Sequence, residues 1–109
     1  MGAFQENNHF LKVMALVRKR PGMYMSPLTP QSLRNFIAGY QASMMFRETS
    51  QSDLGDIMDC IYRAISQKTG IRRSPAMGWA EMLSTFEDDE RGIDIFFECL
   101  DECIRDNKT

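Results

Sequence analysis

Hydrophobic residues recur along most of this chain at spacings of three and four, which places them on one face of an α-helix. The first such segment covers about residues 8–19, and its apolar residues form a single stripe: Phe10, Val13, Met14 and Val17. Segments of the same kind cover residues 30–47, 53–69, 77–83 and 85–105. The alternation of apolar and polar residues that strands need is missing from the sequence. The pattern therefore predicts an all-α fold, with residues 1–109 forming a single-domain bundle of about five helices.

The break after the first helix falls in a short turn made of Arg20, Pro21, Gly22, Met23 and Tyr24. Proline disfavours a helical conformation in the residue before it, so the helix should end at the arginine. Glycine permits the positive φ of a tight turn. We expect a sharp structural turn here, with the methionine and tyrosine side chains seating it on the core.

Residue types at the other breaks predict helix caps. Thr29 followed by Pro30 is typical of an N-cap and the first helical residue. Gly70 follows the third helix, where glycine is the common C-terminal cap. Thr85 with Asp88 three residues later resembles a capping signal for the last helix.

Two residue types raise questions of packing. Gly39 lies inside the second predicted helix, where it costs about 1 kcal/mol relative to alanine, so we expect a neighbouring helix to pack closely there. The chain also has nine methionines. Most should fill the core, but methionine is favoured at adaptable binding surfaces, which makes four of them candidates for partner contact: Met23, Met25, Met44 and Met45.

Composition indicates an ordinary globular protein, because 43% of the residues are hydrophobic and 26% are charged. No apolar run approaches the roughly 18 residues needed to span a bilayer, and the N-terminus lacks the pattern of a signal peptide. We expect a cytoplasmic protein that does not associate with membranes.

The three cysteines are an odd number without a companion cluster of histidines, so they predict neither a disulfide framework nor a zinc site. Cys99 and Cys103 lie four residues apart and so share a helix face, which could hold half of a metal site. Small buried side chains in a reducing compartment are the more ordinary interpretation. We therefore expect no bound metal and no cofactor.

Charge is distributed unevenly although the net charge is only −2. Residues 1–47 contain six Lys or Arg and one acidic residue, whereas residues 81–109 contain three basic and ten acidic residues. The middle of the chain, residues 48–80, contains four of each. The sequence therefore predicts a dipolar molecule.

Five acidic residues of the last predicted helix fall within about 80° of one another at 100° per residue. They are Glu87, Glu90, Asp94, Glu98 and Asp101. Like charges four residues apart destabilise a helix by a few tenths of a kcal/mol per pair, so stability alone gives no reason for this stripe. It is either a solvated face that keeps the protein soluble or a negative surface for a basic partner.

Arg18, Lys19 and Arg20 occupy the last turn of the first helix, where cations interact favourably with the carbonyl end of the helix dipole. With Arg72 and Arg73 they could instead bind phosphate, as a small nucleic-acid-associated regulator would. Clustered cations without interleaved aromatic residues or a recognisable motif are a weak signal of that function. The acidic final third would also repel a nucleic acid, so nucleic acid is the less favoured partner.

Catalysis finds little support in the sequence. His9 is the only histidine, and spacing identifies no partner for it. The acidic stripe could supply paired carboxylates, but a solvated stripe has no apolar pocket to separate their pKa values as acid–base catalysis requires. We expect the protein not to be an enzyme.

Residues 17–25 resemble the Val-Arg-Lys-Arg-Pro-Gly-Met-Tyr segment near the start of the ATPase domain of gyrase B-type topoisomerases. A nucleotide site of that kind needs a glutamate and an asparagine one helical turn apart soon afterwards, followed by an Asp-x-Gly-x-Gly loop. The next helical segment, residues 33–46, contains no acidic residue, and no Gly-x-Gly occurs in the chain. The resemblance therefore does not predict ATP binding.

A wider resemblance joins the Arg-Pro-Gly-Met-Tyr turn to Leu33, Phe36-Ile37 and Gly39-Tyr40. Over about residues 10–45 the chain is similar to small bacterial proteins of which several look like immunity proteins of polymorphic toxin systems, including contact-dependent growth inhibition. The resemblance implies a protein that binds and neutralises a cognate toxin domain, with no catalytic set of its own. A toxin that cleaves nucleic acid has a cationic active site, so a basic nuclease is the expected partner and the five acidic residues are the expected contacts.

Overall fold

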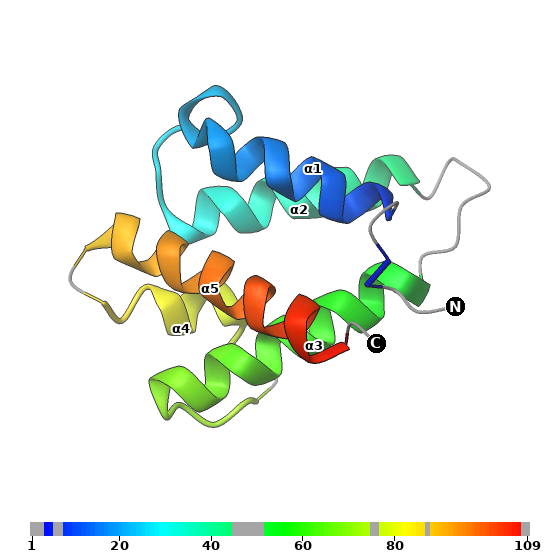
Figure 1. Cartoon of the computed structure of the whole chain (residues 1–109). Coiled ribbons are helices and arrows are strands. Elements are labelled where there is room, and N and C mark those ends of the chain that lie inside the picture. The colour runs from blue at the N-terminus through cyan, green and yellow to red at the C-terminus, as the bar shows by residue number, and fades with distance from the viewer. Residues whose placement is uncertain (1–3, 6–7, 45–51, 75–76, 87, 108–109) are drawn as a thin grey trace.

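The computed structural model describes residues 4–5, 8–44, 52–74, 77–86 and 88–107. Within these ranges the chain forms five α-helices and one short 3₁₀-helix (Figure 1): α1 (His9–Lys19), η1 (Pro21–Met23), α2 (Pro30–Met44), α3 (Ser52–Thr69), α4 (Trp79–Leu83) and α5 (Asp89–Asn107). The same ranges contain no strand, and Ser74 and Met77 form an isolated β-bridge. The predicted all-α fold of about five helices is confirmed.

Helix α5 runs through the middle of the molecule, with α1 and α2 on one side of it and α3 on the other (Figure 1). It packs most extensively on α3 and also contacts α4 and α2. Phe96 is fully buried, and its ring centroid lies 5.0 Å from that of Trp79 on α4 and 5.3 Å from that of Phe97. The core is therefore organised around the inner side of α5.

Two of the predicted caps are confirmed. The Thr29 hydroxyl oxygen accepts a hydrogen bond from the backbone N–H of Ser32 at 3.1 Å, which satisfies one of the free donors at the start of α2. Gly70 has a φ of +73° after the end of α3, the left-handed conformation that favours glycine at this position.

The cap predicted for the last helix is displaced. A carboxylate oxygen of Asp88 accepts a hydrogen bond from the backbone N–H of Glu90 at 2.9 Å, so the aspartate caps α5. The Thr85 hydroxyl instead donates to the carbonyl of Met82 at 2.7 Å, at the end of α4. Thr85 thus lies in the turn after α4, where its hydroxyl and its backbone N–H both donate to the carbonyl of Met82.

The turn after α1 forms as predicted, but with a different backbone. Residues 21–23 form the 3₁₀-helix η1, and the backbone N–H of Tyr24 donates to the carbonyl of Pro21 at 3.0 Å. Gly70 is the only glycine of the described chain with a positive φ, so Gly22 does not use that freedom. A 3₁₀-helix reverses the chain with negative φ throughout.

Of the two side chains expected to seat this turn on the core, Met23 does not do so and Tyr24 does so only in part. Met23 is 69% exposed and Tyr24 is 37% exposed, whereas Met25 is 6% exposed and anchors the turn. The Tyr24 ring packs edge-on against Phe36, with centroids 5.8 Å apart. Of the other methionines proposed for partner contact, Met44 is buried and residue 45 lies outside the described residues, as does the predicted end of α2 at residue 47.

The close helix packing expected at Gly39 occurs at Gly92 instead. A Cβ atom added at Gly39 would meet nothing within 4 Å, because this side of α2 faces away from the other helices. A Cβ added at Gly92 would lie 2.9 Å from the carbonyl oxygen of Leu83 and 3.0 Å from Cγ of Pro30. Gly92 therefore allows α5 to approach the end of α4 and the start of α2.

The cysteines also depart from expectation, because Cys60 on α3 and Cys103 on α5 form a disulfide. The two residues are 43 apart in sequence, with Cα atoms 6.2 Å apart, so only the packing of α3 against α5 brings them together. Cys99 is a buried free thiol. Burial disfavours its thiolate and, helped by the nearby charge of Glu102, raises the pKa of Cys99 to about 11.

The described helices include none with the length and apolar character required to cross a membrane.

Candidate functional site: the outer side of helix α5

Helix α5 has a wide buried side and a narrow outer side. Its buried residues are Gly92, Ile93, Ile95, Phe96, Phe97, Cys99, Leu100 and Cys103. Every other residue of the helix is charged except Ile104 and Asn107. The surface that α5 offers to another molecule is therefore made almost entirely of charged side chains.

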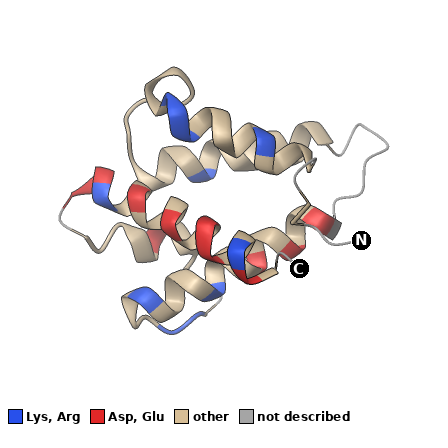
Figure 2. Cartoon of the chain, in the orientation of Figure 1, with Lys and Arg blue, Asp and Glu red and all other residues tan. Residues whose placement is uncertain are grey.

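The structure places four of the five predicted contact residues on this outer side. Glu90, Asp94 and Asp101 are exposed and Glu98 is half-buried. Glu87 lies outside the described residues. In Figure 2 the acidic residues run along α5 between α1 and α3. We call Glu90, Asp94, Glu98 and Asp101 the acidic strip.

Two arginines neutralise part of the acidic strip. Arg91 pairs with Glu98 at 3.0 Å within the helix, as their shared face suggests. Arg18, from the end of α1, pairs with Asp101 at 2.7 Å across 83 residues of sequence. All four side chains are about half exposed, so each pair contributes at most about 1 kcal/mol.

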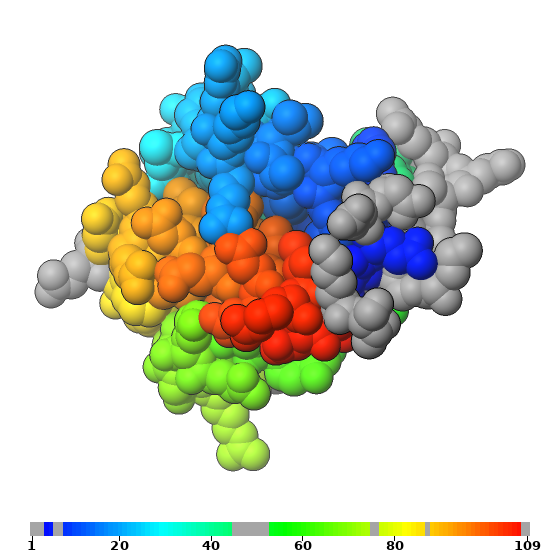
Figure 3. All heavy atoms as spheres, in the orientation of Figure 1, coloured from blue at the N-terminus to red at the C-terminus, as the bar shows by residue number. Residues whose placement is uncertain are grey.

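Arg18 was not expected at this site. The hydrogen bond that Arg18 donates to Asp101 raises the pKa of Arg18 despite a partly opposing effect of burial, and the nearby charges of Asp101, Asp94 and Glu98 add to the rise. Figure 3 shows the end of α1 reaching down onto α5. The basic and acidic ends of the sequence thus meet in the fold, which weakens the dipole that the sequence predicts. No local pattern in the sequence signals this pairing, because it depends on how α1 lies beside α5.

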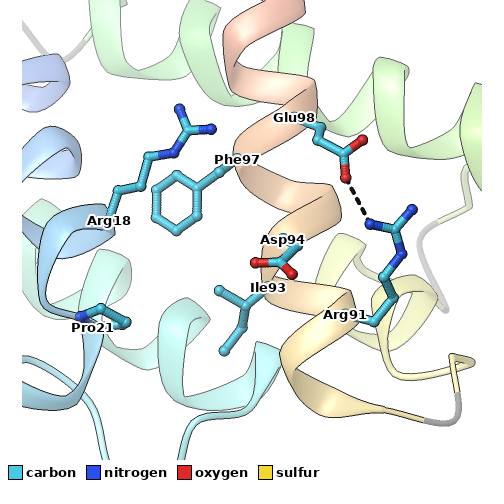
Figure 4. Close-up of a pocket in the computed structure, with 7 residues that line it drawn as sticks. All are labelled: Arg18, Pro21, Arg91, Ile93, Asp94, Phe97 and Glu98. Atoms are coloured by element: carbon cyan, nitrogen blue, oxygen red, sulfur yellow. Dashed lines mark hydrogen bonds and ion pairs between the residues drawn. The ribbon is translucent and has the colours of Figure 1, made fainter.

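A pocket of about 300 Å³ opens beside the acidic strip, at the junction of α1, η1 and α5. It is lined by Arg18, Pro21, Arg91, Ile93, Asp94, Phe97 and Glu98 (Figure 4). The predicted turn therefore reaches the site through its proline. Asp94 forms no ion pair with any residue that the structure describes, although Glu98 and Asp101 farther along α5 do.

The other chemistry-bearing residues of the described chain lie away from this pocket. His9 Nδ1 is 2.6 Å from the Tyr40 hydroxyl oxygen, in a contact between α1 and α2. Within the described ranges, His, Cys, Asp and Glu form no group of three or more that could hold a metal ion.

The basic residues assigned to the alternative function are not gathered together. The end of α1 and the loop after α3 lie on opposite sides of α5 (Figures 1 and 2). Arg73 pairs with Asp59 at 2.7 Å and lies over the Tyr62 ring, 4.4 Å from its centroid. Arg63 also pairs with Asp59 at 2.8 Å, and the two hydrogen bonds, Arg73 first, lower the pKa of that carboxyl group. Arg73 is thus already engaged within the protein.

The arrangement suits electrostatic binding better than bond-making chemistry: an exposed row of carboxylates, a small pocket beside it and two fixed arginines. Comparison with protein-family models, curated proteins and solved structures found no match to this chain.

Proposed function

We propose that this chain is an immunity protein that binds a basic toxin domain, a nuclease, and neutralises it by covering its active site or substrate path. The observation that carries the proposal is the composition of the outer side of α5. Carboxylates at positions 90, 94 and 98 repeat every four residues, a spacing that destabilises the helix. Since the fold gains nothing from this repetition, a partner of opposite charge is the better reason for it.

The proposed partner is a compact domain with a cationic surface, as an enzyme that binds nucleic acid requires. Complementary charge would speed the encounter of the two proteins and fix their register. No cofactor takes part, and the protein itself performs no reaction. The resemblance of residues 10–45 to small immunity proteins supports the same function. We place it in the cytoplasm.

The direct test uses the basic C-terminal domain of a large secreted protein encoded beside this chain, with the two proteins mixed as purified components. We expect a complex whose association slows several-fold in the double variant Asp94→Lys/Glu98→Lys, with a steep dependence on salt. The matched control, Asp56→Lys/Asp106→Lys, makes the same change of net charge at two exposed acidic residues outside the acidic strip. Co-expression should also restore viability to cells that produce the toxin domain.

Equal association rates for the strip variant and the wild type would remove the acidic strip from the interface. Absence of any complex, together with no protection of the cells, would overturn the proposed function.

The alternative is a small regulator that binds nucleic acid through residues 18–20 and 72–73. It is the weaker proposal, because these two segments lie on opposite sides of the molecule and Arg18 and Arg73 are both ion-paired. A salt-sensitive shift of labelled DNA or RNA at low ionic strength would favour it.

A further inference from the structure

The charged part of the pocket lining consists of two carboxylates, Asp94 and Glu98, and two arginines, Arg18 and Arg91. Asp101 lies outside the lining and takes up one of these arginines. Arg18 pairs with Asp101 at 2.7 Å and Arg91 pairs with Glu98 at 3.0 Å. Asp94 lies on the same wall and forms no ion pair with the described residues. Asp94 is therefore the lining carboxylate that has no ion pair among the described residues, although its charge is near enough to Arg18 to help raise the pKa of that guanidinium.

The remainder of the lining is apolar. Ile93 and Phe97 are 6% and 4% exposed, and the edges that they do expose form part of the pocket wall with Pro21. Figure 4 shows the Phe97 ring between Arg18 and the rest of the pocket, with Asp94 and Ile93 close together on the next turn of α5. A ligand that fits must therefore combine a positive head with an apolar body.

The protein already holds a side chain of this kind at the pocket edge. The Arg18 guanidinium carbon lies 5.5 Å from the centroid of the Phe97 ring, within the range of a cation–π interaction. The same guanidinium reaches a carboxylate of the acidic strip. Arg18 thus displays the two contacts that a guanidinium can make here: an aromatic ring and an acidic oxygen.

We infer that this pocket receives one arginine side chain from the basic partner, with its guanidinium on the Asp94 carboxylate and its methylene stem against Ile93 and Phe97. The inference rests on the proposed function and names the chemistry of its central contact. Arginine suits the pocket better than lysine, because a planar guanidinium pairs with a carboxylate through two hydrogen bonds and stacks on aromatic rings. A volume of about 300 Å³ is at the lower end of small-molecule sites, which fits one long side chain.

Asp94 and Glu90 provide a matched pair for the test. Both are exposed carboxylates of the acidic strip, one turn apart on α5, but only Asp94 lines the pocket. Asp94→Asn and Glu90→Gln remove the same charge from the same helix. A general electrostatic attraction would suffer equally from either change, whereas a pocket that binds arginine would suffer from the first alone.

The first experiment titrates N-acetyl-arginine amide into the full isotope-labelled chain at low salt and follows backbone amide signals by NMR. We expect saturable shifts centred on residues 91–98, no such shifts with N-acetyl-norleucine amide, and affinity at least about tenfold lower in Asp94→Asn. Glu90→Gln should stay within about twofold of the wild type. Equal losses in the two variants, no saturable shift, or shifts with inorganic phosphate but not with the arginine amide would each overturn the inference.

The second experiment measures the same two variants against the basic toxin domain of the proposed function. Asp94→Asn should increase the dissociation rate about tenfold or more, and Glu90→Gln should mainly slow association. Complex formation with equal effects of the two variants would reject the pocket and keep the proposed function. Arginine amide binding without any complex would reject the proposed function and keep the pocket.

Discussion

The inner and outer sides of helix α5 differ in residue type, in burial and in what holds them in place. The inner side packs Phe96 against Trp79, brings Gly92 against the ends of two other helices and is bonded to α3 through Cys103. The outer side consists mainly of charged residues, and its ion pairs among the described residues are all at least partly exposed: Arg18–Asp101, Lys68–Glu102, Arg91–Glu98 and Arg105–Asp106. Substitutions on the inner side break contacts or cause steric conflicts. On the outer side, water takes the place of a charged side chain that is removed.

This difference indicates that the two faces of α5 have different roles. Its inner residues supply burial and thus the free energy of folding. Its outer residues contribute little to folding and, through their repeated like charges, oppose it slightly. A binding function is best sought among residues that contribute so little to folding. Three substitutions test this separation, from the largest expected effect to the smallest.

The largest expected effect is loss of the covalent link on the inner side. Cys60→Ser removes the disulfide that closes a loop with a sequence separation of 43, and we expect the free energy of unfolding to fall by about 2–4 kcal/mol, because the unfolded chain gains freedom. Urea unfolding measures the change. A reductant should destabilise the wild type by a similar amount and leave Cys60→Ser unaffected. Identical midpoints for the wild type with and without reductant would contradict the prediction.

An intermediate effect is expected where α5 makes its closest approach to its neighbours. Gly92→Ala places a methyl group 2.9 Å from the carbonyl oxygen of Leu83, and this overpacking should destabilise the protein by about 1–3 kcal/mol. Gly55→Ala in α3 is the control, because its Cβ meets nothing within 4 Å and alanine should stabilise that helix by up to about 1 kcal/mol. Thermal unfolding of both variants gives the comparison. Stabilisation of both would show that α5 can move away at Gly92.

The smallest effect on stability is expected on the outer side. Asp94→Asn removes a carboxylate that repels Glu90 and Glu98, so the melting temperature should stay the same or rise slightly, corresponding to a few tenths of a kcal/mol. The variants used for binding should therefore remain folded at equal concentration. A loss above about 1 kcal/mol in Asp94→Asn would mean that the acidic strip has a structural task, and the separation between the two sides would fail.

Local chemistry accounts for the parts of the fold that the sequence predicted well. The caps at Thr29 and Gly70 depend on neighbours within a few residues, and the spacing of apolar residues determines which segments are helical. The contacts between helices could not be predicted from the sequence in the same way. Gly39 and Gly92 are both glycines inside helices, and only the packing of α5 distinguishes the crowded one from the open one. The pairing of Cys60 with Cys103 depends in the same way on the contact between α3 and α5.

In the candidate site, too, the features set by a single helix could be predicted and those set by packing between helices could not. Helical periodicity alone placed Asp94, Glu98 and Asp101 on one face, because the geometry of a single helix suffices. Arg18 could not be assigned to that face, since its position depends on the placement of α1 beside α5. The pocket could not be predicted from the sequence either, because Pro21 and Phe97 line it from elements far apart in the sequence.

The exposed surface of α5 is narrow, and this affects how the sequence of such a protein can change during evolution. Neighbouring side chains in a packed interior constrain one another, so a change there usually requires a compensating change nearby. Asp94 and Glu90 are free of that constraint, and their replacement leaves the interior as it was. Single substitutions can therefore alter the exposed surface of α5 while the fold stays the same, and under the proposed function such changes would adjust recognition of the partner without a cost in folding.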